Sequence, residues 1–224
     1  MEYVPLEITG AERAFYGESL ILLEGAVEEF LSCVRMIRRY QVSLGRRDPV
    51  ASFQARIKSA ESMKAKLRRK GLPVTAASAL EEVRDAAGVR LICPFARNID
   101  QMTALIRQIP GIRILREKDY IRSPKPNGYR SYHIILSLPL RFLPRPPEEP
   151  VWLEVQLRTL AMDCWASIEH QLKYKQDIEN QALIVQELKR CADEIASTDL
   201  SLQTIRELIE TPARQEEFHA DLSG

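Results

Sequence analysis

The sequence predicts an α+β fold in which about five strands alternate with helices. Three observations support this. Helical periodicity dominates both ends of the 224-residue chain, strand-like alternation dominates its middle, and the composition is that of a globular protein, with 45% hydrophobic and 28% charged residues. Bulk disorder is excluded because it requires low hydrophobicity with a high net charge, whereas the net charge here is +1.

The first third of the chain predicts a helix, a strand and two further helices. Apolar residues at steps of three and four predict a long amphipathic helix over residues 12–41, which the turn at 45–49 ends. Alternating apolar and polar residues predict a strand over 53–58. A capped helix follows over 59–70, and a short helix is predicted over 78–87.

The middle of the chain predicts four more strands. They are expected at residues 88–93, 112–116, 131–138 and 151–158, with a helix over 99–108 between the first two. Parity divides the side chains of each strand between two faces.

The last third of the chain predicts helices. One is expected over residues 160–175, and two more, over 181–196 and 200–210, form an acidic tail. The stretch 139–150 contains five prolines, which predicts a stiff surface connection.

This pattern divides the chain into three regions. We expect an N-terminal helical region over 1–50, a central domain of strands and helices over 51–176 and a C-terminal helical tail over 177–224. The apolar runs are far shorter than the roughly 20 residues of a membrane span, and the N-terminus lacks the basic and apolar regions of a signal peptide. The four cysteines lack metal-binding spacing, so a reduced, cytoplasmic protein is expected.

Positive charge is concentrated in two segments. Residues 56–70 carry seven basic side chains and one acidic one, and residues 107–130 carry seven and two. Such segments in an otherwise neutral chain favour a partner that bears phosphate groups. The alternative is an ordinary charged surface in contact with water. The residues that lie beside the basic side chains distinguish a phosphate-binding site from such a surface.

One predicted sheet face is polar. Glu154, Gln156 and Arg158 alternate with buried-type residues on one strand, and Arg56 and Lys58 share a side of another. A sheet with one apolar and one charged face can form the floor of a polar site, although antiparallel sheets often expose such a face to water.

A cluster of cations suits a triphosphate. Arg56 and Lys58 are followed by Lys66 and Arg69, and arginine provides a flat fork for phosphate oxygens while lysine provides a point charge. Ordinary surface charge is the alternative interpretation.

Two acidic residues can form a magnesium site. Mg²⁺ usually takes one or two carboxylates and completes its shell with water and phosphate oxygens. Asp85, just before a predicted strand, and Glu154 form such a pair if their strands are neighbours. Taken alone, an aspartate at this position is more often a helix or turn cap.

The segment between residues 118 and 133 combines a turn with an aromatic ring and cations. Pro126, Asn127 and Gly128 predict an ordered turn, after which Tyr129 stands among basic residues that include Lys125. This combination fits a stacked base with phosphates nearby. A hairpin tip with a packing tyrosine is the alternative.

Five motifs occur in order and together resemble the synthetase domain of the RelA/SpoT-like alarmone synthetases. They are RIKS, RRKG, DAAGVRLIC, DYIRSPKPNGYRSYH and LEVQLRTLAMDCWASIEHQLKYK. Because the chain is too short for the hydrolase and regulatory domains of the long family members, it resembles a single-domain small alarmone synthetase. The resemblance implies a nucleotidyltransferase-like mixed sheet flanked by helices.

The resemblance also implies a reaction, the stringent-response synthesis of (p)ppGpp and AMP by transfer of the β,γ-pyrophosphate of ATP to the 3′-hydroxyl of GDP or GTP. Asp85 and Glu154 are implied as the catalytic, Mg²⁺-binding residues, with Glu154 taking the hydroxyl proton. The implied ATP-binding residues are Arg56, Lys58, Lys66, Arg69 and His133. The residues implied for GDP or GTP are Tyr129, Lys125, Asn127, Arg90 and Gln156.

The C-terminal tail and Asp163 bear on the assembly and the regulation of the protein. The helical tail resembles the C-terminal helices through which the family forms tetramers, so a homotetramer is expected, with burial of the apolar stripes in a monomer as the alternative. Many small synthetases have Asn where Asp163 stands, and this position is linked with regulation by the product.

Two other functions stay open. One is a toxin of the same fold that pyrophosphorylates the 3′ end of tRNA, and the other is a non-catalytic nucleic-acid-binding protein. The paired acids Asp85 and Glu154 argue against the second, because they would repel a phosphate backbone unless a metal ion intervened.

Overall fold

The structure, a computed structural model, describes residues 6, 8–141, 150–173 and 180–210. Within these ranges, five strands form one mixed sheet in the order β1-β2-β5-β4-β3, which confirms the predicted fold class. β2 and β5 are parallel, and the other neighbouring pairs are antiparallel. The strands are β1 (Ser52–Ile57), β2 (Ala87–Cys93), β3 (Arg113–Asp119), β4 (Tyr132–Ser137) and β5 (Trp152–Thr159).

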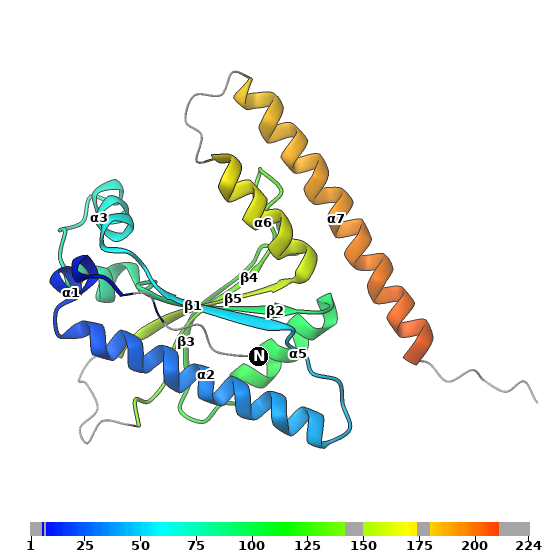
Figure 1. Cartoon of the computed structure of the whole chain (residues 1–224), viewed down its shortest axis with the longest axis horizontal. Helices are drawn as coiled ribbons and strands as arrows, with labels where there is room; N and C mark the ends of the chain where they lie inside the picture. Colours follow the sequence, from blue (N-terminus) through cyan, green and yellow to red (C-terminus); the bar gives the residue numbers. More distant parts are fainter. Residues whose placement is uncertain (1–5, 7, 142–149, 174–179, 211–224) are drawn as a thin grey trace, which may run out of the picture.

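Helices flank the sheet on both sides, as Figure 1 shows. They are α1 (Gly10–Tyr16), α2 (Ser19–Ser43), α3 (Ala60–Arg69), α4 (Ala76–Ser78), the π-helical turn η1 (Ala79–Val83), α5 (Ala96–Arg107), α6 (Leu160–Lys173) and α7 (Gln181–Glu210). None of the helices in the described ranges is long and apolar enough to cross a membrane.

The core lies between one face of the sheet and the helices α2 and α5. Leu153, Val155 and Leu157 alternate along β5 and are fully buried there, as their parity predicts. Phe30 and Leu31 of α2 complete this core with no exposed surface. The opposite face of the sheet is left to polar side chains.

The predicted N-terminal helix is wrong in one respect, because two helices occupy its place. Gly17 has a φ of 54°, a conformation that favours glycine, and it ends α1 before α2 begins at Ser19. α1 is started by Thr9 and Glu12, which form a reciprocal capping box.

The predicted break in the C-terminal tail is also wrong, since α7 runs without interruption from Gln181 to Glu210. The hydroxyls of Thr198 and Ser201 donate to carbonyls one turn earlier, so they stay within the helix. Asp199 is buried and accepts a hydrogen bond of 2.5 Å from Thr159. Tertiary contact therefore replaces the turn that these polar residues suggested.

Two other predicted segments differ from the structure in extent: the helix predicted over 78–87 is replaced by α4 and η1, which end at Val83, and the strand predicted over 112–116 is longer. β3 begins near its predicted start but continues to Asp119, because its pairing with β4 resumes after a bulge between Ile114 and Arg116. Of the proline-rich stretch, residues 142–149 lie outside the described residues.

The helix α1 anchors the segment that follows β1. The Tyr16 hydroxyl donates to the backbone carbonyl of Lys58 at 2.7 Å, and Glu12 Oε1 accepts from the backbone N–H of Ala60 at 3.0 Å. Glu12 also accepts a hydrogen bond from the Thr9 hydroxyl. The chain on both sides of Ser59 is thus held by a helix roughly 45 residues earlier in the sequence.

These bonds generate a prediction for Glu12→Gln. Hydrogen bonds from Thr9 and Ala60 hold the pKa of Glu12 at about 2, so its stabilising effect is complete above its ordinary pKa of 4.5 and is lost as the pH falls toward 2. Glutamine keeps the shape but replaces one acceptor oxygen by a donor. We expect urea denaturation at pH 7 to give a loss of about 1–3 kcal/mol in the free energy of unfolding.

The loss should shrink as the pH is lowered through that window. Glu28→Gln, on the exposed face of α2, makes the same chemical change and should leave stability within about 0.5 kcal/mol of the wild type. Equal effects of the two variants would contradict the assigned role of Glu12.

Candidate active site

The polar face of the sheet is hollow between β1 and β5. The strand register aligns Arg56 with Gly88 on β2, and Gly88 with Glu154 on β5. Gly88 has no side chain, so the space between Arg56 and Glu154 stays open. A Cβ atom at Gly88 would lie 3.9 Å from Arg56 Cγ, which is an ordinary van der Waals distance. A small side chain would therefore fit here without a clash, and the effect of glycine is to leave the space empty.

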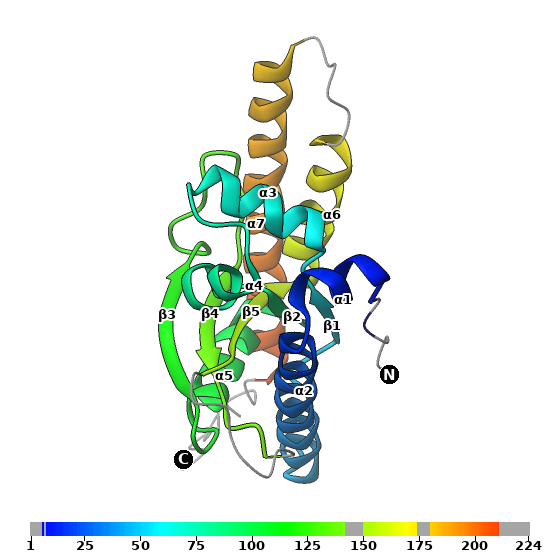
Figure 2. The ribbon, with the colours of Figure 1, turned by 90° about the vertical axis from the view of Figure 1, so that its left-hand side faces the viewer.

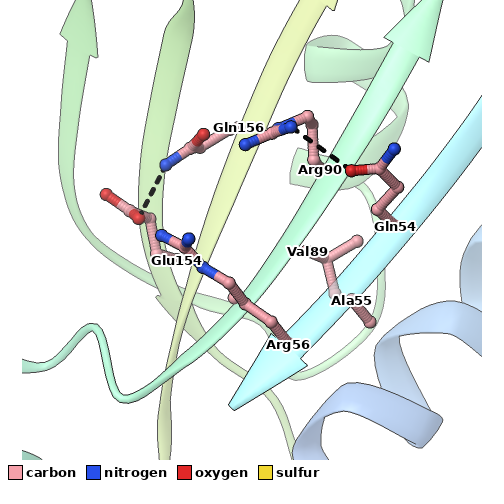
Figure 3. A pocket seen from close by; sticks show the side chains of 8 residues that line it. Gln54, Ala55, Arg56, Val89, Arg90, Glu154 and Gln156 are labelled. Carbon is pink, nitrogen blue, oxygen red and sulfur yellow. Dashed lines mark hydrogen bonds between the residues drawn. The ribbon is translucent and has the colours of Figure 1, made fainter. Parts of the chain in front are cut away.

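The first cavity, here called the arginine cavity, has a volume of about 240 Å³. Figure 3 shows that Arg56 and Arg90 border the same hollow, with the Glu154 carboxylate at its edge. Arg90 donates to Gln54 Oε1 at 3.3 Å, and Gln156 donates to Glu154 Oε2 at 2.9 Å. The lining residues are Gln54, Ala55, Arg56, Gly88, Val89, Arg90, Glu154 and Gln156.

A second cavity of about 250 Å³, here called the lysine cavity, lies on the other side of Glu154. Its positive residues come from α3, β3 and the loop after β3, and its acids include Asp85. The polar residues that line it are Lys66, Lys70, Glu82, Asp85, Arg116, Lys118, Tyr120, Lys125, His133 and Glu154. Glu154 is therefore shared by both cavities.

Asp85 lies between two lysines. Lys58 Nζ is 2.6 Å from Asp85 Oδ2, and Lys66 Nζ contacts the same oxygen. Burial lowers the pKa of Lys58, against the attraction of Asp85. The acid and the cations thus hold one another in place at the cavity wall.

A metal ion fits this site in part. Asp85 Oδ1 is buried and has no hydrogen-bond partner in the described part of the chain, so one acceptor of this carboxylate is unsatisfied. Asp85 and Glu154 line the same cavity. Asp85 lies just before β2 and Glu154 lies in β5, and these two strands are paired. The described residues contain no group of three or more His, Cys, Asp or Glu side chains that could hold an ion, so substrate oxygens would have to complete a shell here.

Glu154 is held as a carboxylate. Burial acts to raise the pKa of Glu154, but the hydrogen bond and charge of His133, together with Gln156 and Lys58, outweigh it and bring the pKa down to about 2. His133 Nδ1 lies 3.3 Å from Glu154 Oε1. This group is ionised at any pH near neutrality.

A hydrogen-bonded chain leads from Glu154 to Tyr129. The Tyr129 hydroxyl lies 2.8 Å from His133 Nε2 and accepts a bond from Arg158 Nη2 at 2.9 Å. Lys125 Nζ lies 4.6 Å from the centre of the Tyr129 ring, within cation–π distance. The tyrosine loop and the carboxylate therefore belong to one network.

Four predicted site residues line neither cavity, and of these Lys58 and Tyr129 contact residues that do, namely Asp85 and His133. Arg69 is exposed on α3 and lines neither cavity. The Asn127 side chain donates to Glu169 at 2.9 Å and accepts from the Tyr129 backbone N–H, which gives it a loop-shaping position. Arg90 and Gln156, predicted beside the acceptor, share a cavity with Arg56, which was predicted for the donor.

The sequence pointed to Asp163 only as a regulatory position, and Arg116, Lys118 and Tyr120 were not predicted as site residues. Asp163 Oδ1 accepts from Arg158 at 2.9 Å and lies 3.2 Å from Arg90, so one carboxylate aligns two arginines. Arg116, Lys118 and Tyr120 share one side of the β3 segment, and their spacing of two residues was the signal that could have found them.

A polar sheet face with two cation-rich cavities that share one ionised carboxylate defines a class of protein that binds polyphosphate ligands and transfers phosphate groups. The family model described as "Region found in RelA / SpoT proteins" matches residues 55–179, and the chain belongs to this family.

Known relatives agree with this membership. The GTP pyrophosphokinase YwaC of Bacillus subtilis (strain 168) is 42% identical over 146 residues, which cover 65% of this chain and 69% of the relative. The GTP pyrophosphokinase YjbM of the same organism is 31% identical over 187 residues, which cover 84% of this chain and 86% of the relative.

Solved structures agree as well. The small alarmone synthetase 1 of Bacillus subtilis, bound to its product pppGpp, superposes with a TM-score of 0.76 and 30% identity, covering 86% of this chain and 96% of the other. The small alarmone synthetase 2 of the same organism gives a TM-score of 0.74 and 35% identity, covering 85% and 98%.

Proposed function

We propose that this chain is a GTP pyrophosphokinase, which transfers the β,γ-pyrophosphate of ATP to the 3′-hydroxyl of GDP or GTP and so makes the alarmone (p)ppGpp. The observation that carries the proposal is the ionised carboxylate of Glu154, because it lies where the two cavities of the donor meet and is connected through His133 to Tyr129 of the acceptor loop. The names of the similar proteins support it.

The donor nucleotide spans the two cavities in this proposal. The arginine cavity offers the guanidinium groups of Arg56 and Arg90 and the amide of Gln156, which suit a flat base and a ribose. Lys58 and Lys66 beside Asp85 suit the triphosphate. Arg90 and Gln156 are therefore assigned to the donor rather than to the acceptor.

The acceptor lies against the tyrosine loop. A guanine base stacks on the ring of Tyr129, which requires the exposed Lys125 side chain to turn from that ring toward phosphate oxygens. His133 then stands between the acceptor and Glu154, since it contacts both Tyr129 and the carboxylate.

The reaction needs a proton acceptor beside the 3′-hydroxyl. The oxygen of this hydroxyl forms a bond to the β-phosphorus of ATP. The bond between the β-phosphorus and the oxygen that bridges it to the α-phosphorus breaks, and AMP leaves with the electron pair. Glu154 takes the hydroxyl proton. His133 and Lys58 keep the pKa of Glu154 low, so substrate phosphates that draw these two groups away would make the carboxylate a stronger base.

Asp85 and Glu154 are the residues that would hold Mg²⁺. They line one cavity, and Asp85 Oδ1 is buried without a hydrogen-bond partner in the described ranges. When bound, the ion supplies positive charge that offsets the negative charge on the transferred group and on the leaving AMP.

The proposal includes assembly into a homotetramer that acts in the cytoplasm, where ATP and GTP are abundant. Support for assembly comes from apolar side chains on the outer surface of α7, such as Leu208 and Ile209, which are 73% and 72% exposed. Their place in the sequence matches the helical tail that resembles the assembly helices of the family.

One assay separates this function from its alternatives. The protein is incubated with Mg²⁺, ATP labelled in the γ-phosphate, and GDP, GTP or tRNA as acceptor. We expect label in ppGpp or pppGpp with release of AMP. Label in tRNA alone would support the toxin reading, and no transfer to any acceptor would leave a nucleic-acid-binding protein.

Glu154→Gln tests the carboxylate directly. The amide has nearly the same shape but cannot accept the proton, so turnover should fall by about 10²–10⁴-fold while the melting temperature stays close to that of the wild type. Glu61→Gln, exposed in the first turn of α3, is the matched control and should retain turnover. Near-normal turnover of the Glu154 variant contradicts its role.

Two substitutions at Tyr129 separate the ring from the hydroxyl. Tyr129→Ala removes the stacking surface and should raise the KM for GTP by about 10-fold, with a smaller change for ATP. Tyr129→Phe keeps the ring but loses the bonds to His133 and Arg158, so it should act mainly on kcat. A change confined to the KM for ATP in the alanine variant would refute the acceptor assignment.

A further inference from the structure

The loop that carries Tyr129 is docked on the C-terminal helix α7. Gly128 lies in this loop with a φ of 89°, and a Cβ atom at that position would come within 2.5 Å of Ala192 Cβ on α7. The loop backbone and the helix therefore touch at a point where neither partner has room for a larger side chain. Figures 1 and 2 both draw the β3–β4 connection beside α7.

Arg130 fixes the same contact from the loop side. It donates to the backbone carbonyl of Ala192 at 3.4 Å and to Asp193 Oδ1 at 3.2 Å. It also donates to the carbonyl of Gly128 at 3.3 Å, so one guanidinium bonds both the loop and the helix. The Arg130 side chain is only 17% exposed.

The helix has little freedom to shift at this point. Trp165 of α6 donates its indole N–H to the carbonyl of Leu188 at 2.8 Å, which ties α6 to α7 one turn before Ala192. The seam between the loop, α6 and α7 contains a free volume of only about 10 Å³, no more than one water molecule needs.

Backbone hydrogen bonds within the loop connect Gly128 to Lys125 and Tyr129. The backbone N–H of Gly128 donates to the carbonyl of Lys125 at 2.8 Å, and the backbone N–H of Lys125 donates to the carbonyl of Tyr129 at 3.2 Å. A displacement at Gly128 therefore displaces Lys125 and Tyr129 as well. Arg56 lies on β1, at the edge of the sheet opposite β3, and is remote from this contact.

We propose that α7 sets the position of the acceptor-binding loop, with Ala192 as a positioning residue that acts on Tyr129 through Gly128. The inference rests on the proposed function, in which Tyr129 stacks on the guanine. It adds that a helix with no residue in either cavity controls the affinity for the acceptor nucleotide and leaves that for the donor unchanged.

Ala192→Leu is the principal test. The added carbons do not fit the seam and push the loop away from α7, and leucine forms helices nearly as well as alanine. Because a displacement of about 1 Å can cost up to 10²-fold, we expect the KM for GTP or GDP to rise by about 10-fold to 100-fold, with the KM for ATP within about twofold.

Two variants control for the substitution itself. Ala182→Leu makes the same change on the exposed surface of α7 and should keep both KM values, and Ala192→Gly adds no atom to the seam and should keep the wild-type KM for GTP. Amide hydrogen exchange at residues 125–130 should be faster in Ala192→Leu than in these controls. This readout does not depend on turnover.

A second pair of variants covers the case in which Ala192→Leu does not fold. Arg130→Met removes the bonds to Ala192 and Asp193 and should raise the KM for GTP several-fold, whereas Arg190→Met, on an exposed stretch of the same helix, should not.

The outcomes are distinct. The inference is overturned if Ala192→Leu raises the KM for GTP and for ATP equally, or if it leaves the KM for GTP unchanged although exchange in the loop is faster. In either case, turnover by the wild-type protein leaves the proposed function intact. A wild-type protein that binds GTP but makes no alarmone refutes the proposed function alone, and GTP binding by the variants, measured by calorimetry, still tests the loop.

Discussion

The constraint on which the site depends is an ionised carboxylate held at the boundary between two positively charged cavities. Burial would favour the neutral acid at Glu154, and the neighbouring imidazole, amide and ammonium groups reverse that preference. The same three groups tie the carboxylate to the rest of the site, because His133 reaches Tyr129 and Lys58 reaches Asp85. A single charge thereby links the walls of both cavities, and removing any of its partners would alter both.

The sheet topology makes this arrangement possible. β2 and β5 are parallel neighbours in an otherwise antiparallel sheet, so the start of β2 lies next to the middle of the site, and Asp85 comes close to the cavity that Glu154 lines. Gly88 leaves the register position between Arg56 and Glu154 empty. The helices then act from outside the sheet, with α1 holding the chain after β1 and α7 holding the tyrosine loop.

Side-chain parity could be predicted from the sequence because it depends only on the period of a strand. The alternation in β5 separated the buried Leu153 and Val155 from Glu154, and the structure confirms that separation. The errors in the N-terminal and C-terminal helices have opposite causes: the end of α1 at Gly17 was missed, whereas in the tail local polarity was taken as the end of a helix. Thr198 and Asp199 suggested a break in the tail, but both find partners that keep α7 continuous. The proposed domain boundaries at residues 50 and 176 stay a prediction.

The sequence by itself determined the fold class, the polar face and most of the charged residues of the site, because periodicity and residue chemistry are local properties of the chain. Only the tertiary structure decided how those residues are shared between cavities. It grouped Arg90 with Arg56, placed Asp163 between two arginines, and brought Gly128 against Ala192. These contacts join residues far apart in the sequence, such as Arg90 with Asp163 and Gly128 with Ala192, and strand order and helix packing, which no local pattern encodes, bring them together.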